Sequence, residues 1–296
     1  MRVFRGIDIG GTAIKVVDVD VDSMTVLEAM HVPSTPLRDE NFGIGLLVEL
    51  CNSRDARLVG IGVAAPGTVD ESSGIVLDAP NLGWRGVPLV SALARRGISV
   101  VLAHDVRAAA RAELLTPDAP DTGHTAVFVA VGTGIAAAVA SGATLLSGSA
   151  SGAGEIGHLR VSGERTPCTC GRTGCLETVA SALAIGRRFR ERGGQRADAA
   201  FVVERARAGE ESAQEVWGEA ILALAEGLAT VTLLLDPDRL VIGGGLVGAG
   251  DALLVPLMEA LSSAMHPWPS PRLERAQWGR FAGGVGAALV AAEAAR

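Results

Sequence analysis

The sequence predicts an α/β protein with two α/β domains and a cleft between them. Apolar strand-like segments alternate with helix-like segments along the chain, which is typical of α/β folds. The 296 residues suit two domains that share a cleft, or one large domain, and 48% of them are hydrophobic, which is ample for a buried core. A strand, a turn of Gly and Thr and a second strand occur near the N-terminus and again near residue 125. This similarity indicates that one supersecondary unit is duplicated.

The first domain is expected over residues 1–118. The tight turn Gly10-Gly11-Thr12 joins its first two strands, and the apolar run that begins at Leu58 leads into Ala65-Pro66-Gly67. The expected strands are 3–9, 13–19, 27–32, 58–63 and 98–102, and the expected helices are 41–52, 89–96 and 105–115.

The second domain is expected over residues 119–283. The preceding segment, TPDAPDTG at 116–123, has the composition of a loop and is the predicted boundary. An Ala-rich helix at 284–295 closes the chain. The other expected elements are strands at 125–131, 135–140 and 239–242, and helices at 179–192, 200–208, 212–235 and 251–265.

One imidazole and three thiols lie close together in the segment GHLRVSGERTPCTCGRTGC. His158, Cys168, Cys170 and Cys175 make a closed tetrahedral set of zinc ligands, with no position left for a catalytic water. The alternative is a reduced protein with scattered thiols, but three of the four cysteines fall within eight residues. The sequence therefore predicts a structural zinc. It would hold the flanking carboxylates of Glu155 and Glu177 in fixed places.

Charge and hydropathy exclude several classes of partner. The net charge is −7 and no stretch is rich in basic residues, which argues against a nucleic-acid partner. No uninterrupted apolar run reaches the ~20 residues needed to span a bilayer, so we expect no membrane partner. The N-terminal segment MRVFRGIDIGGT reads as a strand and not as a signal peptide. A thiolate site without a disulfide framework predicts a cytoplasmic protein.

The first glycine turn has features of a phosphate site. Gly10 and Gly11 let the backbone approach a phosphate, Thr12 adds a hydroxyl donor, and Asp8 could hold Mg²⁺. Lys15, the only lysine of the chain, could reach the same phosphate. The alternatives are a plain hairpin turn and an exposed strand lysine. Neither a Rossmann fingerprint nor a Walker A sequence is present.

Two more glycine turns follow predicted strands. They are Gly132-Thr133-Gly134 and Gly243-Gly244-Gly245, and the second precedes a predicted helix whose N-terminus would favour an anion. Three such turns in two modules predict a nucleotide held between the domains.

Asp105 follows a predicted strand and begins a predicted helix. An aspartate there can cap the helix, and it can also serve as a general base that takes a proton from a hydroxyl nucleophile. The two roles are compatible.

Several of these segments together resemble one family, the ROK family of sugar kinases and regulators, and especially its bacterial glucokinases. The similarity covers essentially the whole chain, and GEIGH with CTCGRTGCLE is its most specific part. The other matching segments are DIGGT, VAAPGTVD, PNLGW, HDVRAAARAE, GTGI and VIGGGL.

The resemblance implies an actin-like ATPase fold, which is related to ribonuclease H. ATP would lie in the cleft, and the closing helix, 284–296, would complete the first domain. It also implies transfer of the γ-phosphoryl group of ATP, with Mg²⁺, to the 6-hydroxyl of a hexose, with glucose as the expected sugar. Such catalysis depends mainly on positioning and charge stabilisation.

Site roles follow from the matching motifs. Asp105 matches the catalytic base, and the zinc ligands are His158, Cys168, Cys170 and Cys175. The positions that match sugar contacts are Gly67, Asn81, Glu155, His158 and Glu177. The positions that match the nucleotide side are Gly10, Gly11, Thr12, Thr133, Gly134 and Gly244.

The chain departs from the family pattern beside the predicted base. His104 and Arg107 stand where family glucokinases usually carry Asn, and the first of these Asn residues contacts sugar hydroxyls. The identity of the sugar is therefore open, although His104 can still form a hydrogen bond. The GGTxxK spacing up to Lys15 is similar to that of polyphosphate-using glucokinases, which makes polyphosphate the alternative donor.

Two other functions remain as alternatives. One is a ROK kinase for an amino sugar, such as N-acetylglucosamine or N-acetylmannosamine, or for a cyclic polyol. The other is a sugar-sensing regulator, which we rank lower because DIGGT begins at Asp8 and leaves no room for a DNA-binding domain before it. Family habit predicts a homo-dimer or homo-tetramer.

Overall fold

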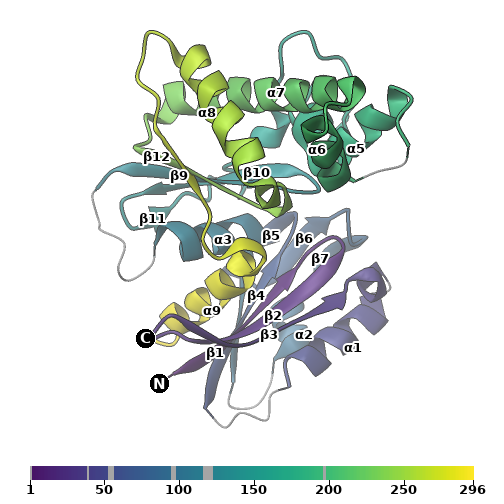
Figure 1. The fold of residues 1–296 in the computed structure, drawn as a ribbon. Coiled ribbons are helices and arrows are strands. Elements are labelled where there is room, and N and C mark those ends of the chain that lie inside the picture. The colour runs from purple at the N-terminus through teal and green to yellow at the C-terminus, as the bar shows by residue number, and fades with distance from the viewer. Residues whose placement is uncertain (1, 39, 53–56, 95–97, 116–122, 196–197) are drawn as a thin grey trace. The chain divides into compact units, whose positions relative to one another are not determined.

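A computed structural model describes residues 2–38, 40–52, 57–94, 98–115, 123–195 and 198–296 (Figure 1). Its contacts divide the chain into two compact units. Unit 1 contains Met1–Ala119, Ser147–Gly152 and Arg280–Arg296. Unit 2 contains Pro120–Leu146 and Ala153–Gly279. Most of the predicted boundary loop, 116–122, lies outside the described residues.

Unit 1 is built on a five-stranded sheet in the order β3-β2-β1-β4-β8. β1 pairs antiparallel with β2 and parallel with β4, and β4 pairs parallel with β8. The predicted strands are all present. Their bounds are β1 Val3–Ile9, β2 Ala13–Asp20, β3 Thr25–Pro33, β4 Leu58–Ala65 and β8 Ser99–His104.

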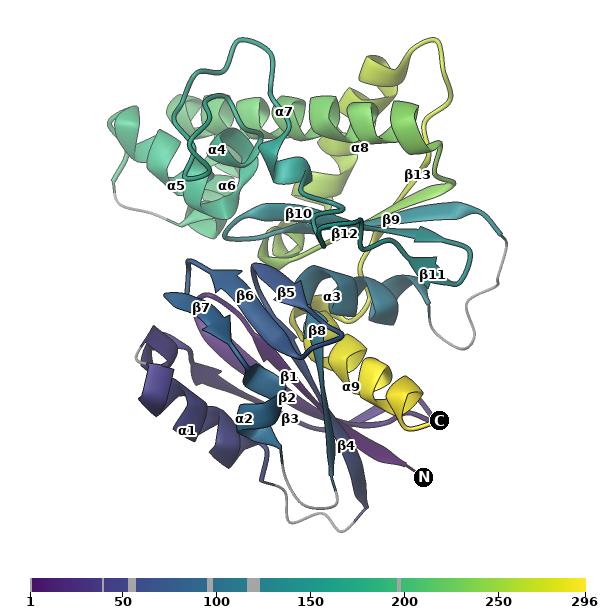
Figure 2. The same ribbon diagram turned by 180° about the vertical axis from the view of Figure 1, so that it is seen from behind.

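The two faces of this sheet carry different helices, as Figure 1 and Figure 2 show from opposite sides. Ile7 and Ile9 of β1 pack in one buried cluster with Leu47 of α1 (Glu40–Leu50) and Leu89 of α2 (Leu89–Leu93). Because side chains alternate along a strand, Asp8 points to the opposite face, where α3 (Asp105–Leu114) and α9 (Ala282–Ala294) lie. The sequence thus places one charged residue of β1 under the closing helix.

α9 lies unusually close to the sheet. A Cβ added at Gly6 of β1 would lie 1.7 Å from the carbonyl oxygen of Gly284 in α9. A Cβ at Gly62 of β4 would lie 1.9 Å from the carbonyl oxygen of Ala287. Glycine is therefore required in both strands, since any larger residue would push the helix away.

A small antiparallel sheet follows β4 and was not predicted. It has the order β5-β6-β7, with bounds β5 Thr68–Asp70, β6 Ile75–Ala79 and β7 Trp84–Val87. Trp84 is 1% exposed and donates its indole N–H to the carbonyl oxygen of Leu37 at 2.8 Å, which fixes this sheet on unit 1.

Unit 2 repeats the strand order of unit 1. Its sheet has the order β11-β10-β9-β12-β13, with β9–β10 antiparallel and β9–β12 and β12–β13 parallel. β9–β10 corresponds to β1–β2, in agreement with the predicted duplication. The bounds are β9 Thr125–Val131, β10 Ile135–Ser141, β11 Thr144–Leu145, β12 Arg239–Gly243 and β13 Arg272–Arg275, of which β11 and β13 were not predicted.

Four helices and the apolar side of this sheet form the core of unit 2. The helices are α5 Ala182–Glu191, α6 Ala199–Arg207, α7 Glu211–Leu235 and α8 Asp251–Met265. The predicted single helix 179–192 is wrong. Ser181 is extended and caps α5 through its hydroxyl, which separates α5 from the short α4, Glu177–Ala180.

α7 alone among the described helices is long and apolar enough to cross a membrane by length and composition. More than half of its apolar window, 56%, is buried inside the protein. It packs against α4, α5, α6 and α8, as a core helix does.

Candidate active site

Three predicted site segments of unit 1 follow neighbouring parallel strands. Asp8 of β1 is in register with Ala64 of β4, and Ala64 is in register with Ala103 of β8. The glycine turn after β1, Gly67 after β4 and Asp105 after β8 therefore lie at the same edge of the sheet. Ligands of open α/β sheets bind at this carboxyl edge.

Asp8 and Lys15 form an ion pair beside the first glycine turn. The Lys15 ammonium donates to the Asp8 carboxylate at 2.8 Å, and the Asp8 side chain is 10% exposed. A Cβ added at Gly10 would lie 3.7 Å from Nζ of Lys15, so the ammonium lies over the turn. A Cβ at Gly283 of α9 would lie 2.7 Å from Cγ of Asp8. The absence of a side chain at Gly283 thus makes the space in which this carboxylate fits.

Asp105 is the first residue of α3, and its carboxylate is accessible. Its Oδ1 accepts a hydrogen bond from the Val106 backbone N–H at 2.7 Å, and its side chain is 29% exposed. The N-cap position of α3 is occupied by His104, which is extended and forms no side-chain capping hydrogen bond, so the predicted capping role of Asp105 is wrong. Asp105 therefore occupies the first turn, where the helix dipole stabilises a negative charge.

His104 is a buried, neutral imidazole next to Asp105. Burial and the nearby charge of Arg107 lower the pKa of His104 to about 4, while Glu71 raises it to a smaller extent. Nδ1 of His104 lies 3.4 Å from Oδ1 of Asp105 but forms no hydrogen bond with any of the residues described. A buried nitrogen of this kind can serve a ligand hydroxyl.

Glu71 connects His104 to Arg107. One oxygen of Glu71 accepts hydrogen bonds from the His104 backbone N–H at 2.8 Å and from Nε and Nη2 of Arg107 at 3.1 and 2.9 Å. Nη1 of Arg107 donates to the carbonyl oxygen of Ser151 at 3.2 Å. The departure at Arg107 is thus accommodated by a charge partner outside the family motifs.

The remaining sugar positions expected in unit 1 lie after β4 and β6. Gly67 has φ 86°, and a Cβ there would lie 2.2 Å from the carbonyl oxygen of Asp78, so only glycine fits. Asn81 lies in the exposed turn between β6 and β7.

The two glycine turns of unit 2 are neighbours at one edge of its sheet. β9 ends before Gly132 and the parallel β12 ends at Gly243. A Cβ at Gly132 would lie 3.8 Å from the backbone nitrogen of Gly245, and one at Gly244 would lie 2.5 Å from the Val131 carbonyl oxygen. Thr133, Gly134 and Gly244 therefore share one region of unit 2.

One part of the prediction for the third turn is wrong. The glycine run leads into a 3₁₀ turn, η3, Gly245–Ala249, and α8 begins only at Asp251. Gly244 is consequently not at the N-terminus of α8. Gly244 instead occupies the N-cap position of η3, and its backbone lies close to that of Val131 in β9.

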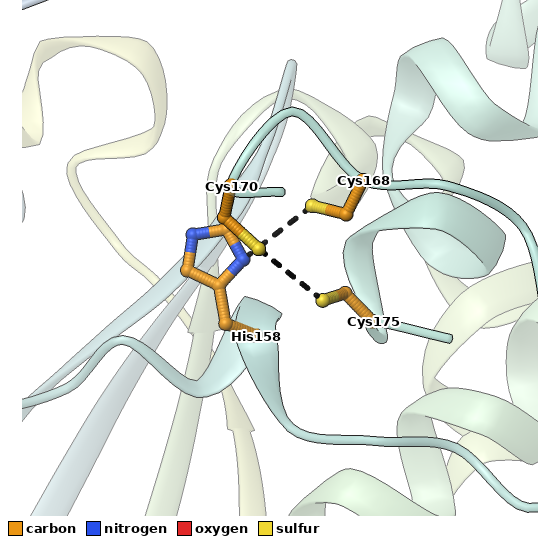
Figure 3. Close-up of side chains that lie close together, drawn as sticks. All are labelled: His158, Cys168, Cys170 and Cys175. Atoms are coloured by element: carbon orange, nitrogen blue, oxygen red, sulfur yellow. Dashed lines mark hydrogen bonds between the residues drawn. The ribbon is translucent and has the colours of Figure 1, made fainter. Parts of the chain in front are cut away.

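The predicted zinc ligands come together in unit 2 (Figure 3). Nδ1 of His158 lies 3.7 Å from Sγ of Cys168, and Sγ of Cys170 lies 3.7 Å from Sγ of Cys175. All four ligand atoms lie within 4.8 Å of one another. Ligands at about 2.3 Å from zinc in tetrahedral geometry lie roughly 3.8 Å apart. The residues therefore fit a tetrahedral zinc site.

The two predicted sugar carboxylates flank this cluster. Glu155 Oε2 lies 3.8 Å from Nε2 of His158, and Glu177 Oε1 lies 3.8 Å from Nδ1 of the same ring. Oε2 of Glu177 would lie 3.1 Å from a Cβ added at Gly134. Glu177 is thus beside both the cysteine cluster and the turn of β9–β10.

Arg172 favours the thiolate form at one ligand. Hydrogen bonds from its backbone and side chain lower the pKa of Cys170 to about 6. Burial raises the pKa of Cys175 to about 12. Metal binding requires thiolates, so the first ligand is pre-ionised near neutral pH, while the second would lose its proton on binding.

The base of the cysteine loop is attached to helices by two carboxylates. Glu164 accepts from the Thr166 hydroxyl and backbone N–H at 2.6 and 2.7 Å, and from the Arg188 guanidinium of α5 at 2.8 Å. Glu226 of α7 accepts from the hydroxyl and the backbone N–H of Ser162. These contacts do not involve the metal ligands.

We expect Glu164→Gln to lower the melting temperature by roughly 2–8 °C at pH 7, because it weakens a charge-assisted pair. Burial raises the pKa of Glu164, but hydrogen bonds from Thr166, Arg165 and Arg188 lower it to about 2. The unfolded chain binds this proton at a higher pH than the folded one, so the stabilisation is complete above the ordinary pKa and lost as the pH falls toward 2.

Thermal unfolding from pH 8 to 3 measures this effect. The gap between wild type and Glu164→Gln should stay constant above about pH 5.5 and shrink below about pH 4. Glu191→Gln is the control, since Glu191 is 61% exposed in its pair with Arg187 and should matter little at any pH. A gap that does not depend on pH would contradict the account.

Sequence reasoning missed Glu71 and Glu164. Both occur in polar turn segments that look solvated, and their partners lie 36 and 24 residues away. The only available signal was Arg107 itself, since an arginine on the Ala-rich helix that begins at Asp105 would need an acidic partner if buried.

The model of the ROK family matches residues 4–294. The chain belongs to the ROK family. The predicted family and the actin-like ATPase fold are both confirmed by this match and by solved ROK structures.

Relatives of the ROK chain include kinases for different sugars. A glucokinase of Halalkalibacterium halodurans is 30% identical over 292 residues, which cover 90% of this chain and 87% of the relative. An N-acetylmannosamine kinase of Escherichia coli K12 is 31% identical over 290 residues, with 96% and 97% covered. The crystal structure of a ROK family glucokinase from Streptomyces griseus in complex with glucose and AMPPNP has 29% identity and a TM-score of 0.86. It covers 98% of this chain and 99% of that one.

Proposed function

We propose that this ROK protein is an ATP-dependent sugar kinase that transfers the γ-phosphoryl group of ATP to the 6-hydroxyl of a hexose, with glucose as the preferred sugar. The main support is the similarity over 98% of the chain to a glucokinase crystallised with glucose and AMPPNP. The accessible carboxylate of Asp105 at the carboxyl edge of the unit 1 sheet supplies the chemistry that such a reaction needs.

Asp105 acts as the general base. A carboxylate accepts the proton of the sugar hydroxyl as its oxygen attacks the γ-phosphorus and the bond to the β-phosphate oxygen breaks. The Val106 N–H, 2.7 Å from Oδ1, fixes the orientation of the carboxylate on α3. The base is thus held by the helix and not by a mobile loop.

Polar side chains supply the proposed contacts to the sugar. Buried or half-buried acceptors discriminate among sugars, because a missing or inverted hydroxyl leaves them unpaired. In this proposal the unpartnered Nδ1 of His104 takes the place of the usual Asn amide. The other sugar-binding residues are Gly67, Asn81, Asp105, Glu155, His158 and Glu177.

The nucleotide is bound by the glycine turns. Backbone N–H groups of such turns favour phosphate oxygens. In unit 1 these residues are Gly10, Gly11 and Thr12 with Lys15, and in unit 2 they are Thr133, Gly134 and Gly244. Asp8 would hold Mg²⁺, whose charge offsets that of the phosphates. The ammonium of Lys15 now on Asp8 would then move to a phosphate.

His158, Cys168, Cys170 and Cys175 would hold a structural zinc. Their distances fit a tetrahedral site, and the carboxylate of Glu155 faces the ring nitrogen that remains, as partners of ligating histidines commonly do. A structural zinc supplies cross-linking energy and no catalytic water.

A coupled assay with ATP, Mg²⁺ and a panel of hexoses and amino sugars tests the proposed function. We expect glucose to give the highest kcat/KM, with the phosphate on the 6-hydroxyl. The same panel with polyphosphate in place of ATP tests the alternative donor suggested by Lys15. A protein that phosphorylates no sugar with either donor would overturn the proposal.

A kinase for an amino sugar is the second candidate. It is favoured by His104, which replaces an amide that contacts sugar hydroxyls, and by the 31% identity to an N-acetylmannosamine kinase. The ratio of kcat/KM for glucose to that for N-acetylmannosamine and N-acetylglucosamine decides between the two.

Compartment and assembly are part of the same proposal. None of the four cysteines, all of which lie in the described residues, forms a disulfide, which supports a reducing, cytoplasmic setting. A homo-dimer or homo-tetramer stays a prediction that light scattering can measure.

A further inference from the structure

A buried guanidinium supports the segment that carries the proposed base. The Arg107 side chain is only 6% exposed, and its charge is balanced by Glu71, whose side chain is 39% exposed. The same oxygen of Glu71 accepts the backbone N–H of His104, the residue directly before Asp105. Glu71 therefore connects the buried charge of α3 to the junction between β8 and α3.

Arg107 also forms a hydrogen bond with the segment that precedes Glu155 in the chain. Its Nη1 donates to the carbonyl oxygen of Ser151 in the segment Ser147–Gly152, which belongs to unit 1. Ser151 has φ 56°, an uncommon conformation for a residue with a side chain. The chain continues at Ala153 into unit 2 and reaches Glu155, a proposed sugar ligand, four residues after Ser151.

Removing Glu71 should be more unfavourable than removing Arg107. Without Glu71, the only hydrogen-bond partner that the buried guanidinium keeps among the described residues is the neutral carbonyl of Ser151, which is unfavourable. Without Arg107, the half-exposed carboxylate of Glu71 can be solvated and can still accept from His104. A buried ion pair often contributes little net stability, because burying the two charges is costly. We therefore consider a role of the pair in orienting its neighbours.

We propose that Glu71 and Arg107 are positioning residues of the phosphoryl transfer. Glu71 orients His104 and Asp105 through the His104 backbone, and Arg107 ties that junction to the segment that leads to Glu155. This inference rests on the proposed function. Small displacements of a reacting group are enough to matter, since about 1 Å can cost on the order of a hundredfold in rate.

A double-mutant cycle tests the pair with Glu71→Gln, Arg107→Gln and the two together. We expect each single change to lower kcat on the order of tenfold, with a smaller change in KM for ATP. The double variant should be no slower than Glu71→Gln alone, because removing Arg107 also removes the unpaired charge. Independent effects that multiply in the double variant would contradict the coupling.

The pKa of His104 distinguishes a positioning role of the pair from a purely structural one. The charges facing its ring are Arg107, Glu71 and Asp105. Arg107→Gln should raise the pKa of His104 and Glu71→Gln should lower it, as measured by NMR with His104→Asn to assign the signal. Unchanged titration in both variants would show that neither charge acts at this junction.

Asp18→Asn is the matched control. Asp18 and Arg5 form a buried pair in the same unit at 2.7 Å, with side chains 6% and 8% exposed, and Arg5 also donates to the carbonyl oxygens of Leu50 and Asn52. This variant should lose stability and keep a normal kcat. An active wild type with normal kcat in both single variants would overturn this inference alone, whereas an inactive wild type would overturn the proposed function.

Discussion

Asp105→Asn should lower kcat by roughly 10²–10⁴, which is the usual contribution of a positioned general base. The substitution removes proton-accepting ability and keeps an oxygen that can accept the Val106 N–H. α3 should therefore still begin at the same residue, and KM for the sugar should change less than kcat. Steady-state kinetics with circular dichroism of the purified variant measure both effects.

Asp198→Asn is the control for the loss of a carboxylate at a helix start. Asp198 caps α6 by accepting the Phe201 N–H at 2.9 Å, remote in sequence from every proposed site segment. Its kcat should stay within about twofold of wild type, as for a surface change away from the site. A near-normal kcat for Asp105→Asn would remove Asp105 from the role of base.

Loss of the zinc should raise KM for the sugar on the order of 10–100-fold, the scale seen when the support of a metal site is removed. Cys175→Ser removes a fully buried ligand. The zinc content measured by elemental analysis should fall from about one zinc per chain to nearly none. Because Glu164 and Glu226 hold the base of the loop without the metal, we expect the fold of unit 2 to persist.

Cys51→Ala is the control, since Cys51 is buried in unit 1 and belongs to no ligand cluster among the described residues. It should retain zinc and a normal KM. Full activity of carefully purified protein that contains no zinc would contradict the proposed role of the cluster.

The sheets and long helices were predictable because their hydrophobic patterns repeat locally. Apolar segments separated by glycine turns coincide with β1, β2, β9 and β10, and long apolar stretches coincide with α7 and α8. The duplicated strand order then follows from connecting similar units.

The remaining elements depend on contacts between distant residues. β5, β6 and β7 are only three, five and four residues long, and they are stabilised by Trp84, whose partner Leu37 lies 47 residues earlier. The break at Ser181 arises because its backbone turns extended and its hydroxyl caps α5. Neither feature leaves a periodic signal in its own segment.

The candidate site divides in the same way. Residues with a motif, such as Asp105 and the cysteine cluster, could be named from the sequence, and the cluster does assemble. Glu71 could not be named, because only the folded chain brings it to His104 and Arg107. Local chemistry is visible in a sequence, whereas the partners of a buried charge are chosen by the fold.

The most direct measurement is a crystal structure of this ROK protein with glucose and a non-hydrolysable ATP analogue. We predict that the 6-hydroxyl lies within hydrogen-bonding distance of the Asp105 carboxylate, about 2.6–3.2 Å, and that Glu155 and Glu177 bind other hydroxyls of the same ring. A sugar bound elsewhere, or one whose 6-hydroxyl faces away from Asp105, would contradict this prediction.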